Sequence, residues 1–208
     1  ALSGAATGLG YSKDVLVLLA TAQWLRNLGY KAVPSLNDSA LVIPLAIQAG
    51  LGEYGRHGLV ITPEFGPRVR FGKIFTDAPV AHDAPIEFGV TAFCEGCRRC
   101  TDACPPKAIP AAGPVSVKLN RSSIGGVRKW SVDGEKCFSY WGQIASDCMI
   151  CIRVCPYNKD FTKRRHRIGR HLAATRLRGL MLWLNGRLGF GLRLKPGDWW
   201  AGATRRRT

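Results

Sequence analysis

The chain has 208 residues, of which 46% are hydrophobic, which is enough for a sizeable core in one domain or two small ones. It contains no run of eighteen apolar residues and no visible secretory signal, so the sequence predicts no membrane-spanning helix. The formal net charge is +16, and 13 of the 30 Lys and Arg residues lie between Lys163 and Thr208. Such a basic segment can face nucleic acid, an anionic membrane or an acidic partner, or it can be a solvated face.

The first predicted elements are a long helix, a short strand and a second helix. Apolar residues at helical spacing predict the first helix over residues 12–28, with Gly29 as its end, and residues 30–33 follow as a strand. The second helix runs through Ala49 and ends at Gly50. Its predicted cap is formed by Asn37, Asp38 and Ser39.

Two more strands are predicted before the chain changes character. Residues 51–58 are rich in glycine and predict a loop. Strands are predicted over residues 59–62 and 69–75, with a turn at 63–67 between them. The alternation of helix and strand indicates an α/β or α+β piece, and a domain boundary is expected near residues 81–92.

All eight cysteines fall in two related motifs. The first reads C-E-G-C-R-R-C-T-D-A-C-P, which is the C-x2-C-x2-C-x3-C-P run of bacterial ferredoxins. The second ends in C-M-I-C-I-R-V-C-P, and ten residues separate its first cysteine, Cys137, from the other three. The fourth cysteine of such a run points away from its own cluster and binds the other one. Two 4Fe-4S clusters are therefore predicted, one on Cys94, Cys97, Cys100 and Cys155, the other on Cys104, Cys137, Cys148 and Cys151.

Two other uses of eight cysteines fit less well. A disulfide framework does not explain two C-x2-C-x3-C-P endings. Zinc sites usually have paired C-x2-C units without a close third cysteine and a terminal proline. The pattern thus favours an electron-transfer protein, or the electron-transfer part of a redox enzyme.

The C-terminal stretch over residues 168–194 mixes leucines with arginines and is amphipathic. It can lie on a membrane surface or against a partner. Packing back onto the body of the protein is the commoner use of such a face, and Trp199 and Trp200 favour it, since large aromatic side chains are usually buried.

Three stretches carry a resemblance to a known family. They are G-L-G-E-Y-G-R-H-G-L-V-I-T-P-E-F-G-P-R-V-R (50–70), K-C-F-S-Y-W (136–141) and D-C-M-I-C-I-R-V-C-P-Y-N-K (147–159). They resemble the corrinoid-dependent reductive dehalogenases. Members of that family are longer, so the resemblance implies a C-terminal fragment of the catalytic subunit.

The resemblance implies an α+β fold in three parts. Residues 1–85 would be part of a nitroreductase-like domain for corrinoid and substrate, residues 86–160 a ferredoxin-type two-cluster domain, and residues 161–208 a basic amphipathic segment. Electrons would pass from an external donor through two 4Fe-4S clusters to the cobalt of a cobalamin-type corrinoid, which reduces a small organohalide. The family also implies a small membrane anchor protein and a location on the exported face of the cytoplasmic membrane, and no nucleic acid partner is expected.

The resemblance assigns catalytic roles to four residues. Tyr11 would supply the proton, and a nearby cation would stabilise the phenolate that remains. Arg70 and Lys73 stand where the family places such a cation, and Asn37 is a further polar position near the substrate. On a regular strand Lys73 would face away from Arg70, unless Gly72 forms a bulge. Without the family, Tyr11 would be an ordinary buried hydroxyl at a helix start, Asn37 a helix cap and Arg70 a surface residue.

By resemblance, the segment from Ser39 to Arg70 would line the nucleotide tail of the corrinoid. Glycine backbone and arginine side chains would make the contacts. The candidates are Ser39, Gly50, Gly52, Gly55, Arg56, Gly66 and Arg68.

Two other functions compete with dehalogenation. The related epoxyqueuosine reductases share the glycine and arginine segment and the cluster motifs, and in that case the basic segment would bind tRNA. A plain ferredoxin-like carrier without catalysis would need only the cysteines.

Overall fold

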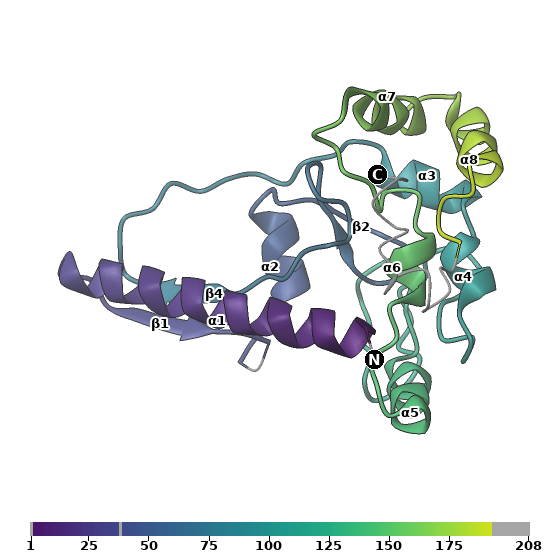
Figure 1. The fold of residues 1–208 in the computed structure, drawn as a ribbon. Coiled ribbons are helices and arrows are strands. Elements are labelled where there is room, and N and C mark those ends of the chain that lie inside the picture. Colours follow the sequence, from purple (N-terminus) through teal and green to yellow (C-terminus); the bar gives the residue numbers. More distant parts are fainter. Residues whose placement is uncertain (1, 38, 193–208) are drawn as a thin grey trace.

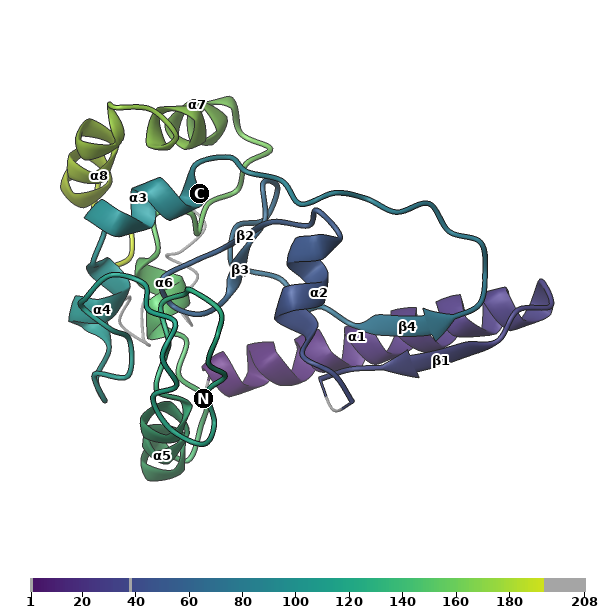
Figure 2. The ribbon, with the colours of Figure 1, turned by 180° about the vertical axis from the view of Figure 1, so that it is seen from behind.

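The computed structural model describes residues 2–37 and 39–192 and shows an elongated molecule with two unlike halves (Figure 1). In one half, here called the arm, α1 (Leu2–Asn27) lies along a two-stranded antiparallel sheet of β1 (Ala32–Ser35) and β4 (Lys73–Thr76). The other half, the cysteine half, is built of short helices. A long connection without regular structure leads from β4 back to the cysteine half, and Figure 2 shows it from behind. The predicted mixture of helix and sheet is confirmed.

The first helix begins ten residues earlier than predicted, at Leu2. Ser12 is therefore no helix cap, and its hydroxyl donates to the carbonyl of Gly8 one turn back, at 2.9 Å. Tyr11 lies within the helix rather than at its start. The predicted end is confirmed, since Gly29 follows the helix with a φ of +94°.

Contacts with distant residues explain why a glycine-rich start forms a helix. The hydroxyl of Ser3 donates to the carbonyl of Asp147 at 2.6 Å, and a Cβ on Gly4 would lie 3.3 Å from the hydroxyl of Ser146. These partners directly precede Cys148 in the second cysteine motif. Local helix propensity alone predicts against a helix here, because glycine is a poor helix former.

The second helix, α2 (Val42–Gln48), has no polar cap. Leu41 is its N-cap and makes no side-chain bond, so the cap predicted at residues 37–39 is wrong. Asn37 bonds to another helix instead, and Asp38 lies outside the described residues. Gly50 takes a φ of +66° just after the helix, which confirms the predicted end.

A short hairpin follows, formed by β2 (Glu53–Tyr54) and β3 (Val60–Ile61). The strand predicted over residues 59–62 is confirmed, whereas β2 was wrongly predicted as loop. The glycines of the turn made this segment resemble a loop in the sequence. The amide of Gly55 donates to the carbonyl of Leu59 at 2.9 Å, and the amide of Gly58 donates to the carbonyl of Gly55 at 2.9 Å. Ile61 is fully buried in the core of the cysteine half, so the hairpin packs there.

The strand predicted over residues 69–75 begins later, at Lys73. Arg70 precedes the strand, so the predicted comparison of Arg70 and Lys73 on one regular strand does not apply. Gly72 marks the change, because its Cα lies against the side chain of Leu18 and leaves no room for a Cβ. Lys73 pairs with Ser35 across the sheet.

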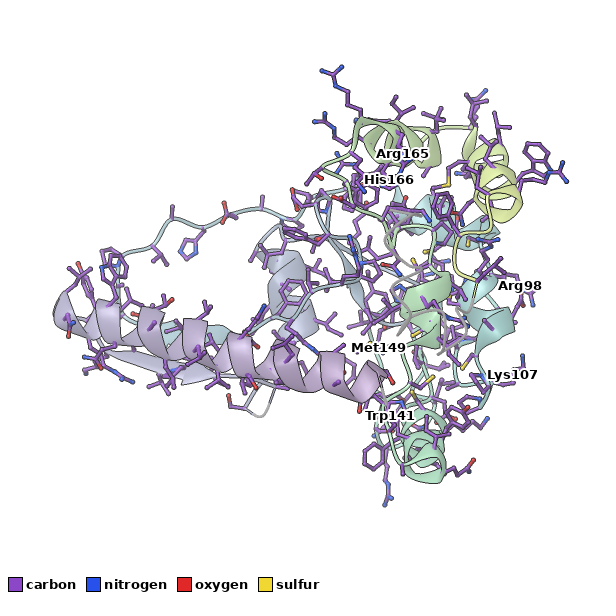
Figure 3. All side chains as sticks on the ribbon, in the orientation of Figure 1. Arg98, Lys107, Trp141, Met149, Arg165 and His166 are labelled. Carbon is purple, nitrogen blue, oxygen red and sulfur yellow. The ribbon has the colours of Figure 1, made fainter. Side chains whose placement is uncertain are left out.

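The cysteine half is arranged around α3 (Val90–Gly96), α4 (Arg99–Ala103), α5 (Gly134–Ile144) and α6 (Ile150–Val154). Helices α4 and α6 each belong to one cysteine motif, and they pack against each other. Figure 3 shows sulfur atoms gathered around these two helices, while Arg98 and Lys107 point outward at the edge of the molecule. The main core joins α3, the hairpin and the end of the second motif, through buried residues that include Ile61, Val90, Phe93, Trp130 and Tyr157.

The basic C-terminal stretch forms α7 (Arg164–Ala173) and α8 (Arg178–Arg187), which pack against each other. Ala173 and Met181 are buried in the main core, so this stretch packs back onto the body of the protein. Leu194, Trp199 and Trp200, which the prediction also used, lie outside the described residues. Within residues 2–37 and 39–192 no helix has the length and apolar character needed to cross a bilayer.

Candidate iron–sulfur centre and its surroundings

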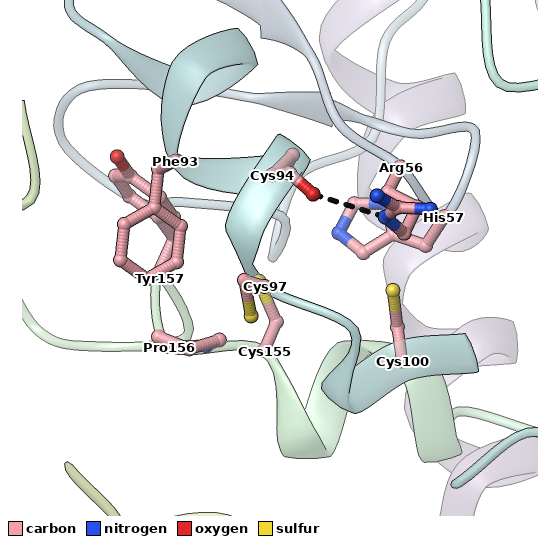
Figure 4. A pocket seen from close by; sticks show the side chains of 9 residues that line it. All are labelled: Arg56, His57, Phe93, Cys94, Cys97, Cys100, Cys155, Pro156 and Tyr157. Atoms are coloured by element: carbon pink, nitrogen blue, oxygen red, sulfur yellow. Dashed lines mark hydrogen bonds between the residues drawn. The ribbon is translucent and has the colours of Figure 1, made fainter. Parts of the chain in front are cut away.

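Four cysteines line one enclosed hollow. Cys94 lies in α3, Cys97 directly follows α3, Cys100 lies in α4, and Cys155 directly follows α6. Cys155 thus joins three cysteines of the other motif, because α4 and α6 pack side by side. The rest of the wall is aromatic and apolar on one side and polar on the other, and is formed by Phe93, Pro156, Tyr157, Arg56 and His57 (Figure 4).

The other four cysteines form a second group. Cys137 lies in α5, Cys148 precedes α6, Cys151 lies in α6, and Cys104 directly follows α4. Burial raises the pKa of Cys137, and the nearby Cys104 and Cys148 raise it further, so these thiols lie close to one another. Cys104 and Cys155 have matching extended backbones, with ψ values of 114° and 127°. Each ends its helix, and each is followed by a proline.

Burial makes these thiols hold their protons. It raises the pKa of Cys94, Cys100 and Cys151 to about 12, and that of Cys155 well above its ordinary value. A buried thiolate is unfavourable unless positive charge compensates it. Iron would supply that charge, and its binding would release the protons.

The grouping fits two clusters better than zinc or disulfides. All eight cysteines are free thiols. Among the residues that the structure describes, no three His, Cys, Asp or Glu side chains converge closely enough to hold a single metal ion. Zinc would require such convergence, with each sulfur about 2.3 Å from one centre. Two sets of four cysteines match the ligand set of two 4Fe-4S clusters.

Glu53, which the sequence did not single out, positions the helix that carries Cys94. Its buried carboxylate accepts hydrogen bonds from the amides of Phe88, Val90 (3.1 Å) and Thr91 (3.3 Å), and from the Thr91 hydroxyl. These amides are free donors at the start of α3, so Glu53 caps this helix from 35 or more residues away. The capping carboxylate has no sequence signal, because it comes from another element.

Arg56 ties the hairpin to the first cysteine motif. It is 3% exposed, and its guanidinium lies 5.0 Å from the centre of the Trp130 ring. All three guanidinium nitrogens donate to backbone carbonyls at 3.0–3.3 Å. The acceptors are Cys94, Glu95, Pro110, Ala111 and Ala112. The side chain predicted to contact a corrinoid is thus committed to the cysteine half.

His57 is a second buried residue that the sequence did not single out. It lies in the hairpin turn, and its ring lines the hollow of the first four cysteines. Burial lowers the pKa of His57 to about 4, so the imidazole is neutral. Nothing in the local sequence distinguishes this histidine, since its neighbours in the hollow come from later segments.

The glycines predicted to line a corrinoid are packed against this chain itself. A Cβ would lie 2.6 Å from the Ala84 carbonyl at Gly50 and 2.8 Å from the His57 ring at Gly55. Gly52 similarly abuts the Ile61 carbonyl, and Gly66 the Tyr157 carbonyl. Close packing within the chain is therefore a sufficient reason for glycine at these positions.

The two remaining corrinoid candidates lie on the surface. Arg68 is exposed and donates to the carbonyls of Phe65 at 3.3 Å and Lys159 at 2.5 Å. Ser39 is also exposed, and its hydroxyl contacts that of Ser35. Ser39 is thus an exposed polar side chain whose contact, with Ser35, lies in the arm. The arginine candidates instead donate to carbonyls of the cysteine half.

The structure brings three of the four catalytic candidates together. The side-chain amide of Asn37 donates to the hydroxyl of Tyr11 at 2.7 Å. The guanidinium of Arg70 lies over the Tyr11 ring, 4.3 Å from its centre. Lys73 donates to the carbonyl of Leu36, next to Asn37. These contacts place an amide and a cation beside the phenol of Tyr11.

The stretch that holds the cysteines matches a known protein family. A family model described as a 4Fe-4S double cluster binding domain matches residues 93–158, which contain all eight cysteines. The cysteine half therefore contains a binding domain for two 4Fe-4S clusters.

The relatives identify the family. Tetrachloroethene reductive dehalogenase of Desulfitobacterium hafniense is 44% identical over 162 residues, which cover 76% of this chain and 29% of that protein. A solved structure titled "Reductive dehalogenase structure suggests a mechanism for B12-dependent dehalogenation" superposes with a TM-score of 0.71 at 31% identity, over 83% of this chain and 25% of the other. The chain belongs to the reductive dehalogenases. It spans less than a third of the length of these two relatives.

A second group of relatives is more distant. Epoxyqueuosine reductase of Lactococcus garvieae is 32% identical over 132 residues, covering 63% of this chain and 36% of that protein. Both identity and coverage favour the dehalogenases.

Proposed function

We propose that this chain is part of an enzyme that removes halide from an organohalide by reduction. Each turnover would consume two electrons and one proton, replace a carbon–halogen bond with a carbon–hydrogen bond and release the halide ion. The two clusters, held by the eight cysteines, would carry the electrons one at a time from an external donor. The family membership supports the reaction class.

The observation that carries the proposal is the group formed by Tyr11, Asn37 and Arg70. The Tyr11 hydroxyl would give its proton to the carbon that loses the halogen. Arg70 would stabilise the phenolate left behind, and Asn37 would hold the hydroxyl in place through its 2.7 Å hydrogen bond. Lys73 would position this loop by holding the carbonyl of Leu36.

A cobalamin-type corrinoid would supply, when bound, the cobalt that takes electrons from the clusters and activates the carbon–halogen bond. Within this chain we propose Ser39 and the glycine backbone between Gly50 and Gly66 as its contacts. Arg56 and Arg68 would support that segment from behind, since both donate to carbonyls of the cysteine half. For the fold, we propose that residues 1–85 form part of a nitroreductase-like domain that holds this corrinoid.

The test is Tyr11→Phe in protein reconstituted with iron, sulfide and a corrinoid. Halide release from a brominated or chlorinated substrate should fall by about 100-fold or more, while the cluster EPR signals stay unchanged. Tyr30→Phe is the matched control, because Tyr30 lies beyond the end of the same helix, and it should retain activity. Full activity in Tyr11→Phe would remove this residue from the mechanism, and a complete enzyme containing this chain that neither binds corrinoid nor releases halide would refute the reaction itself.

A second candidate is an epoxyqueuosine reductase type of activity on tRNA, which the more distant relatives and the basic C-terminal segment favour. It predicts tight, strongly salt-dependent binding of a tRNA stem-loop. The membrane anchor protein and the exported location stay proposals that rest on family resemblance. Co-purification of the chain with a small membrane protein would test them.

A further inference from the structure

His57 is held rigidly against the hollow of the first four cysteines. It is 6% exposed and lies in the turn between β2 and β3. The amide of Leu59 donates to its Nδ1 atom at 3.2 Å. Gly55 also packs against the ring, since a Cβ there would lie 2.8 Å from Cε1. The ring is thus fixed in both position and orientation.

This hydrogen bond decides which ring nitrogen carries the proton. Nδ1 accepts from Leu59, so it has no hydrogen of its own, and the proton of the imidazole is on Nε2. Nε2 is buried, and no hydrogen-bond partner for it exists among the described residues. Buried donors are almost always paired, so an unpaired N–H at the wall of a cofactor hollow indicates a partner within that hollow.

We propose that the Nε2–H group of His57 donates a hydrogen bond to a sulfur atom of the cluster held by Cys94, Cys97, Cys100 and Cys155, and thereby raises its reduction potential. Reduction adds one negative charge to the cluster, and a donor aimed at sulfur stabilises the reduced form more than the oxidised form. Figure 4 draws the Cys100 sulfur on the side of the hollow where Arg56 and His57 lie. The inference requires only the two-cluster domain, and it holds whether or not the protein reduces organohalides.

The neighbouring Arg56 does not supply this hydrogen bond. It also lines the hollow, but its guanidinium nitrogens all donate to backbone carbonyls. Arg56 therefore acts on the cluster through its charge, and His57 through a directed donor. A change at His57 alone isolates the effect of the hydrogen bond.

The first test compares His57→Met with His57→Gln in the full chain reconstituted with iron and sulfide. Methionine fills the space without a donor, and glutamine keeps an N–H near the place of Nε2. In an EPR-monitored redox titration, His57→Met should lower the potential of the first cluster by about 59 mV, which is a tenfold change in its reduction equilibrium. His57→Gln should restore most of this shift.

The second cluster, held by Cys104, Cys137, Cys148 and Cys151, is the internal control and should keep its potential. Cys94→Ala and Cys148→Ala assign the two EPR signals. An unchanged first potential in His57→Met, with both clusters assembled, would overturn the proposal. So would an equal shift of both clusters, because that indicates a general structural change.

A spectroscopic measurement needs no destabilising variant. In unsubstituted protein labelled with 15N-histidine, pulsed EPR of the reduced first cluster should detect one coupled nitrogen and one proton that exchanges in D2O. In His57→Gln the coupling to the labelled nitrogen should vanish, and the coupling to the exchangeable proton should weaken. A reduced first cluster without any histidine coupling would refute the hydrogen bond, even if His57→Met fails to assemble.

Discussion

The two halves of the molecule bury their apolar side chains to very different degrees. In the cysteine half, Phe93 is 2% exposed and Tyr157 is 1% exposed, and both belong to the core around the first cluster hollow. In the arm, Leu16 is 68% exposed and Trp24 is 59% exposed, although both lie in a long, regular helix. A long regular helix such as α1 therefore does not show that the arm has a hydrophobic core of its own. The cysteine half has its own core, whereas α1 has the apolar composition of a helix that is covered on several sides.

The halves are joined by a few directed contacts rather than by a shared core. Ser3 of α1 bonds to Asp147, and Arg68 bonds to Lys159. The hairpin is the exception, because Ile61 lies in the main core and Arg56 holds two loops of the cysteine half. Changes in the cysteine half and at the hairpin should therefore cost much more than changes in the arm.

Cys155→Ala should have the largest effect on the cysteine half. Although Cys155 belongs to the second motif, its loss should destroy the cluster of Cys94, Cys97 and Cys100. Bound iron should then fall by about half. Cys104→Ala is the matched variant and should remove the other cluster. Iron and sulfide analysis with EPR checks both. Loss of the cluster within each cysteine's own motif would contradict the crossed ligand sets.

Arg56→Met should loosen the joint between the hairpin and the cysteine half. It leaves five carbonyl groups without their donor, and each unpaired buried group is costly, so the free energy of local opening should fall by about 3 kcal/mol. Hydrogen exchange of residues 94–97 measures this opening. Arg26→Met is the control in the arm. Among the described residues its guanidinium donates to the Ala32 carbonyl alone, so the change should cost about 1 kcal/mol or less. Equal losses in the free energy of local opening for the two variants would show that Arg56 does not hold the hairpin to the cysteine half.

Gly66→Ala should have the next largest effect. Gly66 has a φ of +59°, and a Cβ would press on the carbonyl of Tyr157, so the change should cost about 2 kcal/mol of local opening at residues 157–159. Gly142→Ala is the matched control, because Gly142 lies in helix α5 with open space around it. The control should be neutral or slightly stabilising. Gly66→Ala with native exchange would mean that the loop yields without strain.

The sequence predicted the cysteine half better than its surroundings, for a physical reason. Cluster ligands recur at fixed spacings, so Cys94 and Cys155 could be assigned without a structure. Glu53, Arg56 and His57 act on partners that are 35 or more residues away in the chain or in other segments of the hollow. No local pattern contains such partners, and the three roles became visible only in three dimensions.

The same distinction explains the outcome for the arm. The end of α1 at Gly29 was predictable, because a glycine with positive φ is a local device. Its start was not, because it depends on contacts with Ser146 and Asp147. The roles of Tyr11, Asn37 and Arg70 came from family resemblance, and the structure adds that their side chains meet.

The smallest predicted effect tests the arm itself. Trp24→Ala should change the local opening of α1 by no more than about 0.5 kcal/mol, because its side chain is more than half exposed. Phe93→Ala, the aromatic counterpart in the cysteine half, should cost about 3 kcal/mol or more in α3, because it leaves a cavity in a packed core. Hydrogen exchange of both helices in the reconstituted chain gives the two values. A loss above about 1 kcal/mol for Trp24→Ala would mean that another surface covers α1 in solution, and the contrast between the two halves would then belong to this chain alone and not to the assembled protein.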